Sequence, residues 1–126
     1  MKTFFYIMMT LILLIGFGYL LLGKSENINN KNTGGVTLEG NIQKVTLGIK
    51  NYNYYPNTIK VQAGQPVRIY LDKSVVGCYR GFVIKDFGIS EYLKTPNDYV
   101  EFTPTKKGTF RFSCSMGMGT GTIIVE

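Results

Sequence analysis

The sequence of 126 residues contains no histidine and no tryptophan, and it has only two cysteines. Because imidazole is missing, Ser-His-Asp and Cys-His nucleophilic triads are excluded, as is any metal site built on histidine within this chain. Cys78 and Cys114 do not form a CxxC motif, which excludes a thioredoxin-type redox centre. No other arrangement of residues is typical of catalysis, so the sequence favours a protein that is not an enzyme.

Acidic residues are sparse as well, and the net charge is +6. The basic residues are scattered, and Lys106 and Lys107 are the only adjacent pair. This distribution lacks the basic stripe that is typical of nucleic-acid binding, so we expect no nucleic-acid partner. An ordinary solvated surface is the expectation, with weak attraction to an anionic membrane as the alternative.

The amino-terminal segment is apolar: residues 3–22 carry no charge and are bounded by Lys2 and Lys24. At about 1.5 Å per residue, such a helix spans the roughly 30 Å hydrocarbon core of a lipid bilayer. A cleaved signal peptide is the competing interpretation, but the run is long for one and no Ala-x-Ala site follows it. We therefore expect residues 1–23 to be an uncleaved, single-pass transmembrane anchor. A short amino-terminal tail before a span usually leaves the following domain on the extracytoplasmic face, although the charge bias here is weak.

A polar, asparagine-rich segment ending in Gly-Gly follows at residues 24–35. It has almost no apolar residues to bury, so it is predicted to be a flexible linker. From residue 36 to 126, short runs rich in Val, Ile, Thr, Tyr and Phe alternate with turn residues, the cleanest at 67–71. We expect about seven short strands in an all-β sandwich. Residues 51–57 are predicted to be a turn, and residues 89–93 are either a helical turn or a connection.

The strand expected at residues 109–113 leads into Cys114-Ser115-Met116-Gly117-Met118. Both phenylalanines of the strand, the cysteine and the two methionines fall on alternate positions, so we expect this phase to bring three sulfur atoms to one place. Thiolates and thioethers are soft ligands that favour Cu(I). If the sheet also brings in Cys78, near the end of another strand, two thiolates balance the charge of two Cu(I) ions. Zinc fits less well, because thioethers are weak partners for it.

Other interpretations remain for these residues. Two cysteines in a small extracytoplasmic β-domain often form a disulfide, and such a stapled domain could serve as an interaction module. Methionines also fill cores, although the serine and glycines around these two argue against it. Three nearby residues could shield the site, or they could have ordinary packing or surface roles: Tyr79, Arg80 and Tyr92. We expect the packing or surface roles.

The order of elements resembles the cupredoxin fold over roughly residues 55–126. The resemblance rests on an Ala-Gly-x-Pro-Val turn, a Thr-Pro-x-x-x-Gly turn, a Phe-x-Phe-x-Cys strand and a final Gly-x-Ile-x-Val strand. It implies a Greek-key β-sandwich. Blue-copper members hold copper with histidines, which are absent here, so a blue Cu(II) electron-transfer site is not expected.

The anchor, the linker, Cys78 and the Cys-x-Met-x-Met loop together resemble the membrane-anchored cupredoxin-fold copper(I) chaperones of streptococci and related Gram-positive bacteria. This resemblance implies two Cu(I) ions bridged by Cys78 and Cys114, with Met116 and Met118 on the outer, more weakly held ion. It also implies copper resistance through transfer of Cu(I) to a copper-exporting P-type ATPase. We expect a monomer at the cell membrane, with its soluble domain on the extracytoplasmic face.

Overall fold

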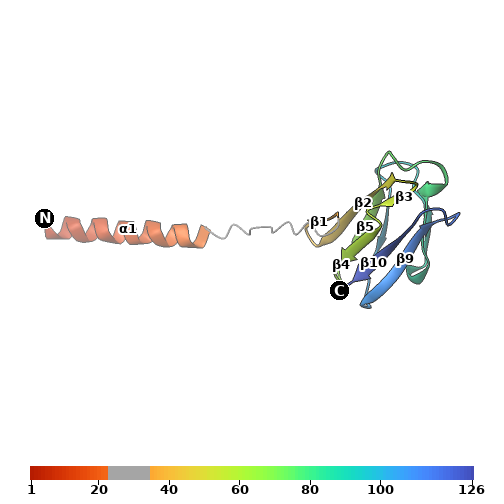
Figure 1. The fold of residues 1–126 in the computed structure, drawn as a ribbon. Coiled ribbons are helices and arrows are strands. Elements are labelled where there is room, and N and C mark those ends of the chain that lie inside the picture. The colour runs from red at the N-terminus through yellow and green to blue at the C-terminus, as the bar shows by residue number, and fades with distance from the viewer. Residues whose placement is uncertain (23–34) are drawn as a thin grey trace.

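The computed structural model describes residues 1–22, with side chains up to residue 18, and residues 35–126 (Figure 1). Helix α1, Lys2–Leu22, coincides with the predicted apolar segment. In the part of the chain that the structure describes, no helix combines the length and apolarity of a membrane span. The transmembrane anchor predicted for residues 1–23 is therefore not confirmed. The linker predicted at residues 24–35 lies, except for Gly35, outside the described residues.

Two five-stranded sheets form a sandwich from residue 36 onward. One sheet has the order β1-β2-β5-β8, with β3 also paired to β2; its strands are Val36–Glu39, Ile42–Lys50, Val67–Leu71, Tyr99–Phe102 and, for β3, Asn53–Tyr55. The other has the order β4-β10-β9-β6-β7; its strands are Thr58–Val61, Thr120–Val125, Gly108–Cys114, Gly81–Ile84 and Ile89–Tyr92. The pairs β2–β5 and β4–β10 are parallel, and the others are antiparallel. Two short 3-10 helices flank β6: η1, Gly77–Arg80, and η2, Lys85–Phe87.

The predicted β-sandwich is confirmed, but the strands are more numerous than expected. Part of the turn predicted at residues 51–57 is β3, which pairs with the end of β2. The ambiguous segment at residues 89–93 contains β7, at the edge of the second sheet. Both strands are short, so their alternation covers too few residues to be distinguished from a loop in the sequence.

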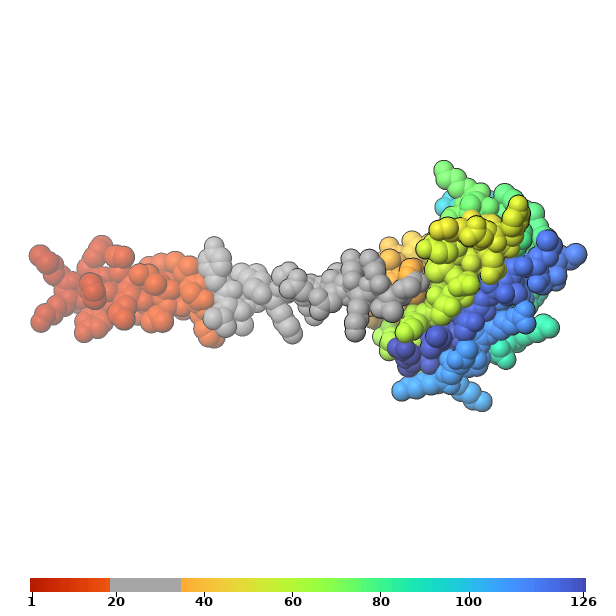
Figure 2. All heavy atoms as spheres, in the orientation of Figure 1, coloured from red at the N-terminus to blue at the C-terminus, as the bar shows by residue number. Residues whose placement is uncertain are grey.

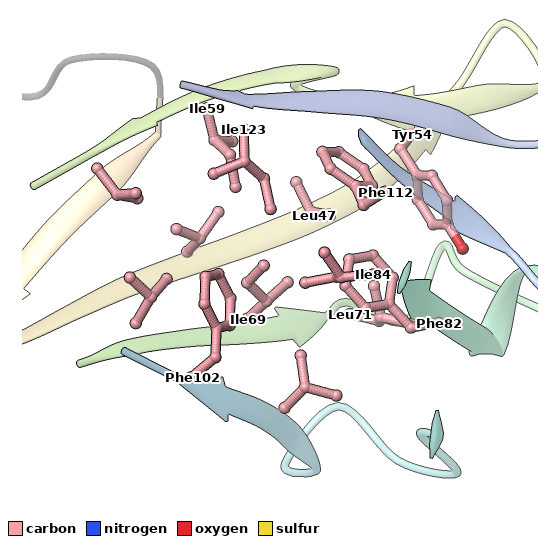
Figure 3. Packing of buried hydrophobic residues seen from close by; sticks show 14 of the residues in the cluster. Leu47, Tyr54, Ile59, Ile69, Leu71, Phe82, Ile84, Phe102, Phe112 and Ile123 are labelled. Carbon is pink, nitrogen blue, oxygen red and sulfur yellow. The ribbon is translucent and has the colours of Figure 1, made fainter. Parts of the chain in front are cut away.

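The core lies between the sheets and is filled by alternating apolar side chains (Figure 3). Three aromatic rings meet at one end of it: Tyr54 of β3, Phe82 of β6 and Phe112 of β9, with ring centroids 5.4–5.8 Å apart. Such tilted and edge-to-face pairs are favourable beyond the apolar area that they bury. The three rings therefore join the two sheets and form the floor beneath the β9–β10 loop.

The register of β9 and β10 places Cys114 and Thr120 at one end of the sandwich, and Gly108 and Val125 at the other. The carboxy terminus consequently lies at the opposite end from the β9–β10 loop (Figure 1). That loop connects the two strands across residues 115–119, which contain both predicted methionine ligands.

Candidate metal centre

Cys114 is the last residue of β9, and its side chain is buried, with 2% of its surface exposed. The backbone N–H groups of Met118 and Gly119 both donate to its sulfur, with N–Sγ distances of 3.2 Å. Its own N–H donates to the carbonyl of Gly119 at 2.9 Å. The loop therefore folds back over the cysteine and directs backbone dipoles at the sulfur.

These dipoles change the acidity of the thiol. Burial raises the pKa of Cys114, because a thiolate is poorly solvated inside a protein. The backbone N–H groups of residues 116–119 act in the opposite sense and prevail, so that the pKa lies below that of an ordinary thiol. The loop thus favours the thiolate, which is the form that binds metal.

The alternation of inward- and outward-facing side chains along β9 ends at Cys114. The N–H of Gly117 donates to the carbonyl of Cys114 at 2.9 Å, and Gly117 has a φ of 73°, so residues 114–117 form a turn. Met116 and Met118 are consequently 70% and 63% exposed instead of continuing into the core. The strand alternation that was expected to continue through both methionines therefore stops at Cys114. In the space-filling view, the loop projects from the rim of the domain (Figure 2).

Cys78 lies in η1, one turn before β6, whereas the sequence placed it near a strand end. Its sulfur lies 3.8 Å from the sulfur of Met118. Both cysteines are free thiols in the structure, so the disulfide considered above is not formed. The structure thus brings Cys78 to Met118, and Met118 to Cys114, from two segments 36 residues apart in the sequence.

Arg80 fixes η1 beneath the site. It is only 8% exposed, and its guanidinium donates to the carbonyls of Leu93, at 2.8 Å, and Asp72, at 3.1 Å. These bonds satisfy the buried charge and tie η1 to the segments around it. Arg80 therefore has a packing role, while Tyr92 is largely exposed at the end of β7.

Tyr54 and Tyr79 lie behind the loop. For Tyr54 the sequence had favoured a packing or surface role over a place in the site. The hydroxyl of Tyr54 donates to the carbonyl of Tyr79, and the two rings meet edge to face. Burial raises the pKa of Tyr54 strongly, and Cys114 and Cys78 raise it further, so the phenol stays neutral. The alternation along Asn53-Tyr54-Tyr55 could have indicated that Tyr54 faces inward, but a strand of three residues is too short for such a pattern to be recognised.

A hollow of about 510 Å³ lies beside the loop on the outer side of β9. Its lining comes from β6, η2, β9 and the start of the loop; it consists of Val83, Lys85, Asp86, Arg111, Ser113, Cys114, Ser115, Met116 and Gly117. Met116 is therefore reached from solvent on this side, while Met118 faces Cys78. The two methionines have different surroundings, although both are exposed.

The chemistry of the donor atoms limits which metal fits. Within residues 1–22 and 35–126, no three side chains of His, Cys, Asp or Glu converge in a way that could hold a metal ion. The side chain with a further sulfur donor beside Cys78 is that of Met118. Two thiolates with thioethers form a soft set that suits Cu(I) and not Mg²⁺ or Ca²⁺, which require oxygen.

Comparisons with known proteins agree with this fold. The metal-binding domain of the Cu(I)-exporting P-type ATPase CopA from Streptococcus pneumoniae D39, determined with Cu(I), is 30% identical, with a TM-score of 0.64 over 72% of this chain and 92% of that domain. A copper-binding protein in its apo form is 31% identical, with a TM-score of 0.63 over 72% of this chain and 94% of its own. Amicyanin from Paracoccus versutus is 21% identical, with a TM-score of 0.50 over 66% of this chain and 81% of its own, and shows the shared fold alone.

Among curated proteins, none matches the chain. The sequence profile of the cupredoxin-like domain family, in contrast, matches residues 11–125, which is most of the sequence. The two-sheet sandwich and the similarity to two copper-binding domains agree with that match. The chain belongs to the cupredoxin-like domain family.

Proposed function

We propose that this protein is a copper(I) chaperone that binds Cu(I) as cargo through Cys78, Cys114, Met116 and Met118 and is not an enzyme. The observation that carries the proposal is the 3.8 Å approach of the Cys78 and Met118 sulfur atoms, next to a buried Cys114 whose acidity is increased. The likeness to a Cu(I)-binding domain of an exporting ATPase supports it. The same likeness supports a copper-exporting P-type ATPase as the receiver.

The four sulfur atoms suit two ions held with different strength. Two thiolates supply two negative charges, so that Cys78 and Cys114 can bridge two Cu(I) ions without net charge. Met116 and Met118 complete the outer ion as neutral ligands. Because thioethers bind without charge, the outer ion is the one held more weakly, and it faces solvent.

Transfer then proceeds by exchange of sulfur ligands. A thiolate of the acceptor forms a bond to the outer Cu(I). The bonds from that ion to Met116 and Met118 and to the bridging thiolates break, and the thiolates of Cys78 and Cys114 stay on the inner ion. No proton moves at the methionines, and Cu(I) keeps its oxidation state throughout. The 70% and 63% exposure of the two side chains gives an acceptor direct access.

Native mass spectrometry of the full-length protein, reduced, anaerobic and in detergent, tests the assignment. We expect uptake of two Cu(I) ions by the parent and of one by a variant with Met116→Leu and Met118→Leu. We expect no tight binding by Cys114→Ser. Met8→Leu, which changes a methionine of α1, is the matched control and should bind two ions. If the cysteine and methionine variants bind copper like the parent, the assignment is wrong.

We also propose that the domain is tethered at the extracytoplasmic face of the cell membrane. The large apolar side chains exposed along α1, among them Phe4, Ile7 and Leu11, support an association with lipid. Cell fractionation should place the full-length protein in the membrane pellet, resistant to carbonate, and should release a protein lacking residues 1–23. Recovery of the full-length protein in the soluble fraction would contradict the tether. Size-exclusion chromatography tests the expected monomer.

A further inference from the structure

The corner between β2 and β3, residues 51–54, contacts both segments that carry the sulfur ligands. Asn51 and Tyr52 have positive φ angles, 53° and 62°, so the chain reverses sharply before β3. The reversal places Asn53 and Tyr54 under the β9–β10 loop and beside η1. From the sequence, packing and surface roles were favoured for the tyrosines of this segment over a place in the site.

The corner is joined to η1 by two hydrogen bonds that run in opposite directions. The hydroxyl of Tyr54 donates to the carbonyl of Tyr79, the residue that follows Cys78. The hydroxyl of Tyr79 donates to the carbonyl of Tyr52 at 3.0 Å. Because the bonds involve both the backbone and the side chain of Tyr79, they fix the position and the rotation of η1 relative to the corner.

The corner is joined to the β9–β10 loop through Asn53. Its side-chain oxygen accepts the N–H of Thr120 at 2.8 Å and the N–H of Tyr54 at 2.9 Å. Thr120 follows Gly119, whose N–H donates to the sulfur of Cys114. An amide oxygen of β3 thus holds the loop at the point where it turns back into β10.

We infer that the β2–β3 corner is a clamp: through Asn53 and Tyr54 it sets the separation between Cys78 and the Cys114–Met118 loop, and so acts as a positioning element for Cu(I). The inference rests on the proposed copper-binding function. The two sulfur-bearing segments, η1 and the β9–β10 loop, are distant in the sequence, and the corner is bonded to η1 and to the end of the loop. Neither Asn53 nor Tyr54 is a ligand; each acts through the backbone of a neighbouring segment.

Preorganised ligands bind more tightly because less ordering remains for the metal to impose. Loss of one hydrogen bond that holds η1 or the loop therefore weakens Cu(I) binding by about tenfold, the change that corresponds to roughly 1.4 kcal/mol. Release of Cu(I) should accelerate by a similar factor. A residue with only a structural role would change the stability of the apo protein and leave the affinity of the folded protein unchanged.

The test compares four variants of the full-length protein in detergent. Tyr54→Phe removes one hydroxyl, and Asn53→Ala removes the acceptor for Thr120. Asn53→Asp keeps a side-chain oxygen at the same place and is the expected rescue. Tyr55→Phe is the matched control, because Tyr55 is the next residue, is largely exposed and lies beside Lys50 instead of the site.

Cu(I) affinity is measured by competition with a chromophoric Cu(I) chelator, and urea unfolding confirms that each apo variant is folded under those conditions. We expect a loss of about tenfold for Tyr54→Phe and Asn53→Ala, with Asn53→Asp and Tyr55→Phe close to the parent. Parent-like affinity in both Tyr54→Phe and Asn53→Ala would overturn the clamp alone. A parent protein that takes up no Cu(I) would overturn the proposed function together with the clamp.

Discussion

Replacing Gly119 with alanine tests how closely the β9–β10 loop fits the tyrosines behind it. An added Cβ would lie 2.9 Å from two ring carbons of Tyr79 and 3.0 Å from a ring carbon of Tyr54. Carbon atoms in ordinary contact are about 3.5–4.0 Å apart, so either the loop or the rings must move by about 0.5 Å. The N–H and carbonyl of residue 119, which bond to Cys114, remain present in the variant. Any effect on copper therefore comes from displacement of the loop.

The expected magnitude combines two opposing terms. Overpacking of this kind costs about 1–3 kcal/mol in the free energy of unfolding. The lower conformational entropy of alanine in the unfolded chain offsets about 0.4–1 kcal/mol of that cost. We expect Gly119→Ala to lose about 1–2 kcal/mol of apo stability in urea unfolding. We expect Cu(I) affinity, measured by chelator competition, to fall by about tenfold.

Gly40→Ala separates the effect on copper from the effect on stability. Gly40 lies in the β1–β2 turn with a φ of 64° and open space where a Cβ would be, so alanine there causes backbone strain without a clash. Its expected cost is about 1–2 kcal/mol, similar to that of Gly119→Ala, but with parent-like Cu(I) affinity. Parent-like Cu(I) binding by folded Gly119→Ala, or equally weakened binding by Gly40→Ala, would show that the fit of the loop against the tyrosines does not set the affinity.

Three further changes test the surroundings of the site. The pKa of Cys114 in the folded protein lies below the ordinary thiol pKa of about 8.5, so the thiolate stabilises the folded apo protein. This contribution should be complete above about pH 8.5 and should be lost as the pH falls through the folded pKa. Urea midpoints measured against pH should therefore show a slope that Cys114→Ser lacks. Arg80→Met leaves the carbonyl of Leu93 without its donor, while the carbonyl of Asp72 keeps the N–H of Val75. The change should cost about 1–3 kcal/mol in urea unfolding, and parent-like stability would contradict a structural role. Gln43→Ala removes side-chain hydrogen bonds to the β4–β5 turn, which lies near the carboxy terminus, at the end of the sandwich away from the β9–β10 loop. It should lower the free energy of unfolding by about 2–4 kcal/mol and leave Cu(I) affinity unchanged, and a fall in affinity as well would contradict this expectation.

The sheet sandwich and the burial of Cys114 could be predicted because alternation in β9 is long enough to fix which side chains face inward. The same alternation did not predict the positions of Met116 and Met118, because the chain turns at Gly117 and leaves both side chains exposed. The meeting of Cys78 with Met118 is a tertiary contact between η1 and the loop, and no local pattern encodes it. The sequence identified the sulfur residues by their chemistry, whereas the fold determined which of them meet.

The role of the β2–β3 corner could not be predicted for a related reason. Tyr54 belongs to a three-residue strand inside a segment rich in Asn and Tyr, which indicates a turn. Its importance comes from the hydroxyl that reaches Tyr79 and from the ring that packs on Phe82 and Phe112. These contacts depend on how the two sheets stack, which is settled only when the whole core assembles.

X-ray absorption at the copper edge, recorded on the full-length protein loaded anaerobically with Cu(I), identifies the atoms that bind the metal. We expect Cu(I) with sulfur as its only nearest neighbours, because the chain has no histidine and Cys78, Cys114, Met116 and Met118 supply the ligands. Leucine at both methionine positions should leave copper bound by the thiolates alone. A nearest-neighbour shell that requires nitrogen or oxygen, or one unchanged when the cysteines are replaced by serine, would show that these four residues do not bind the copper.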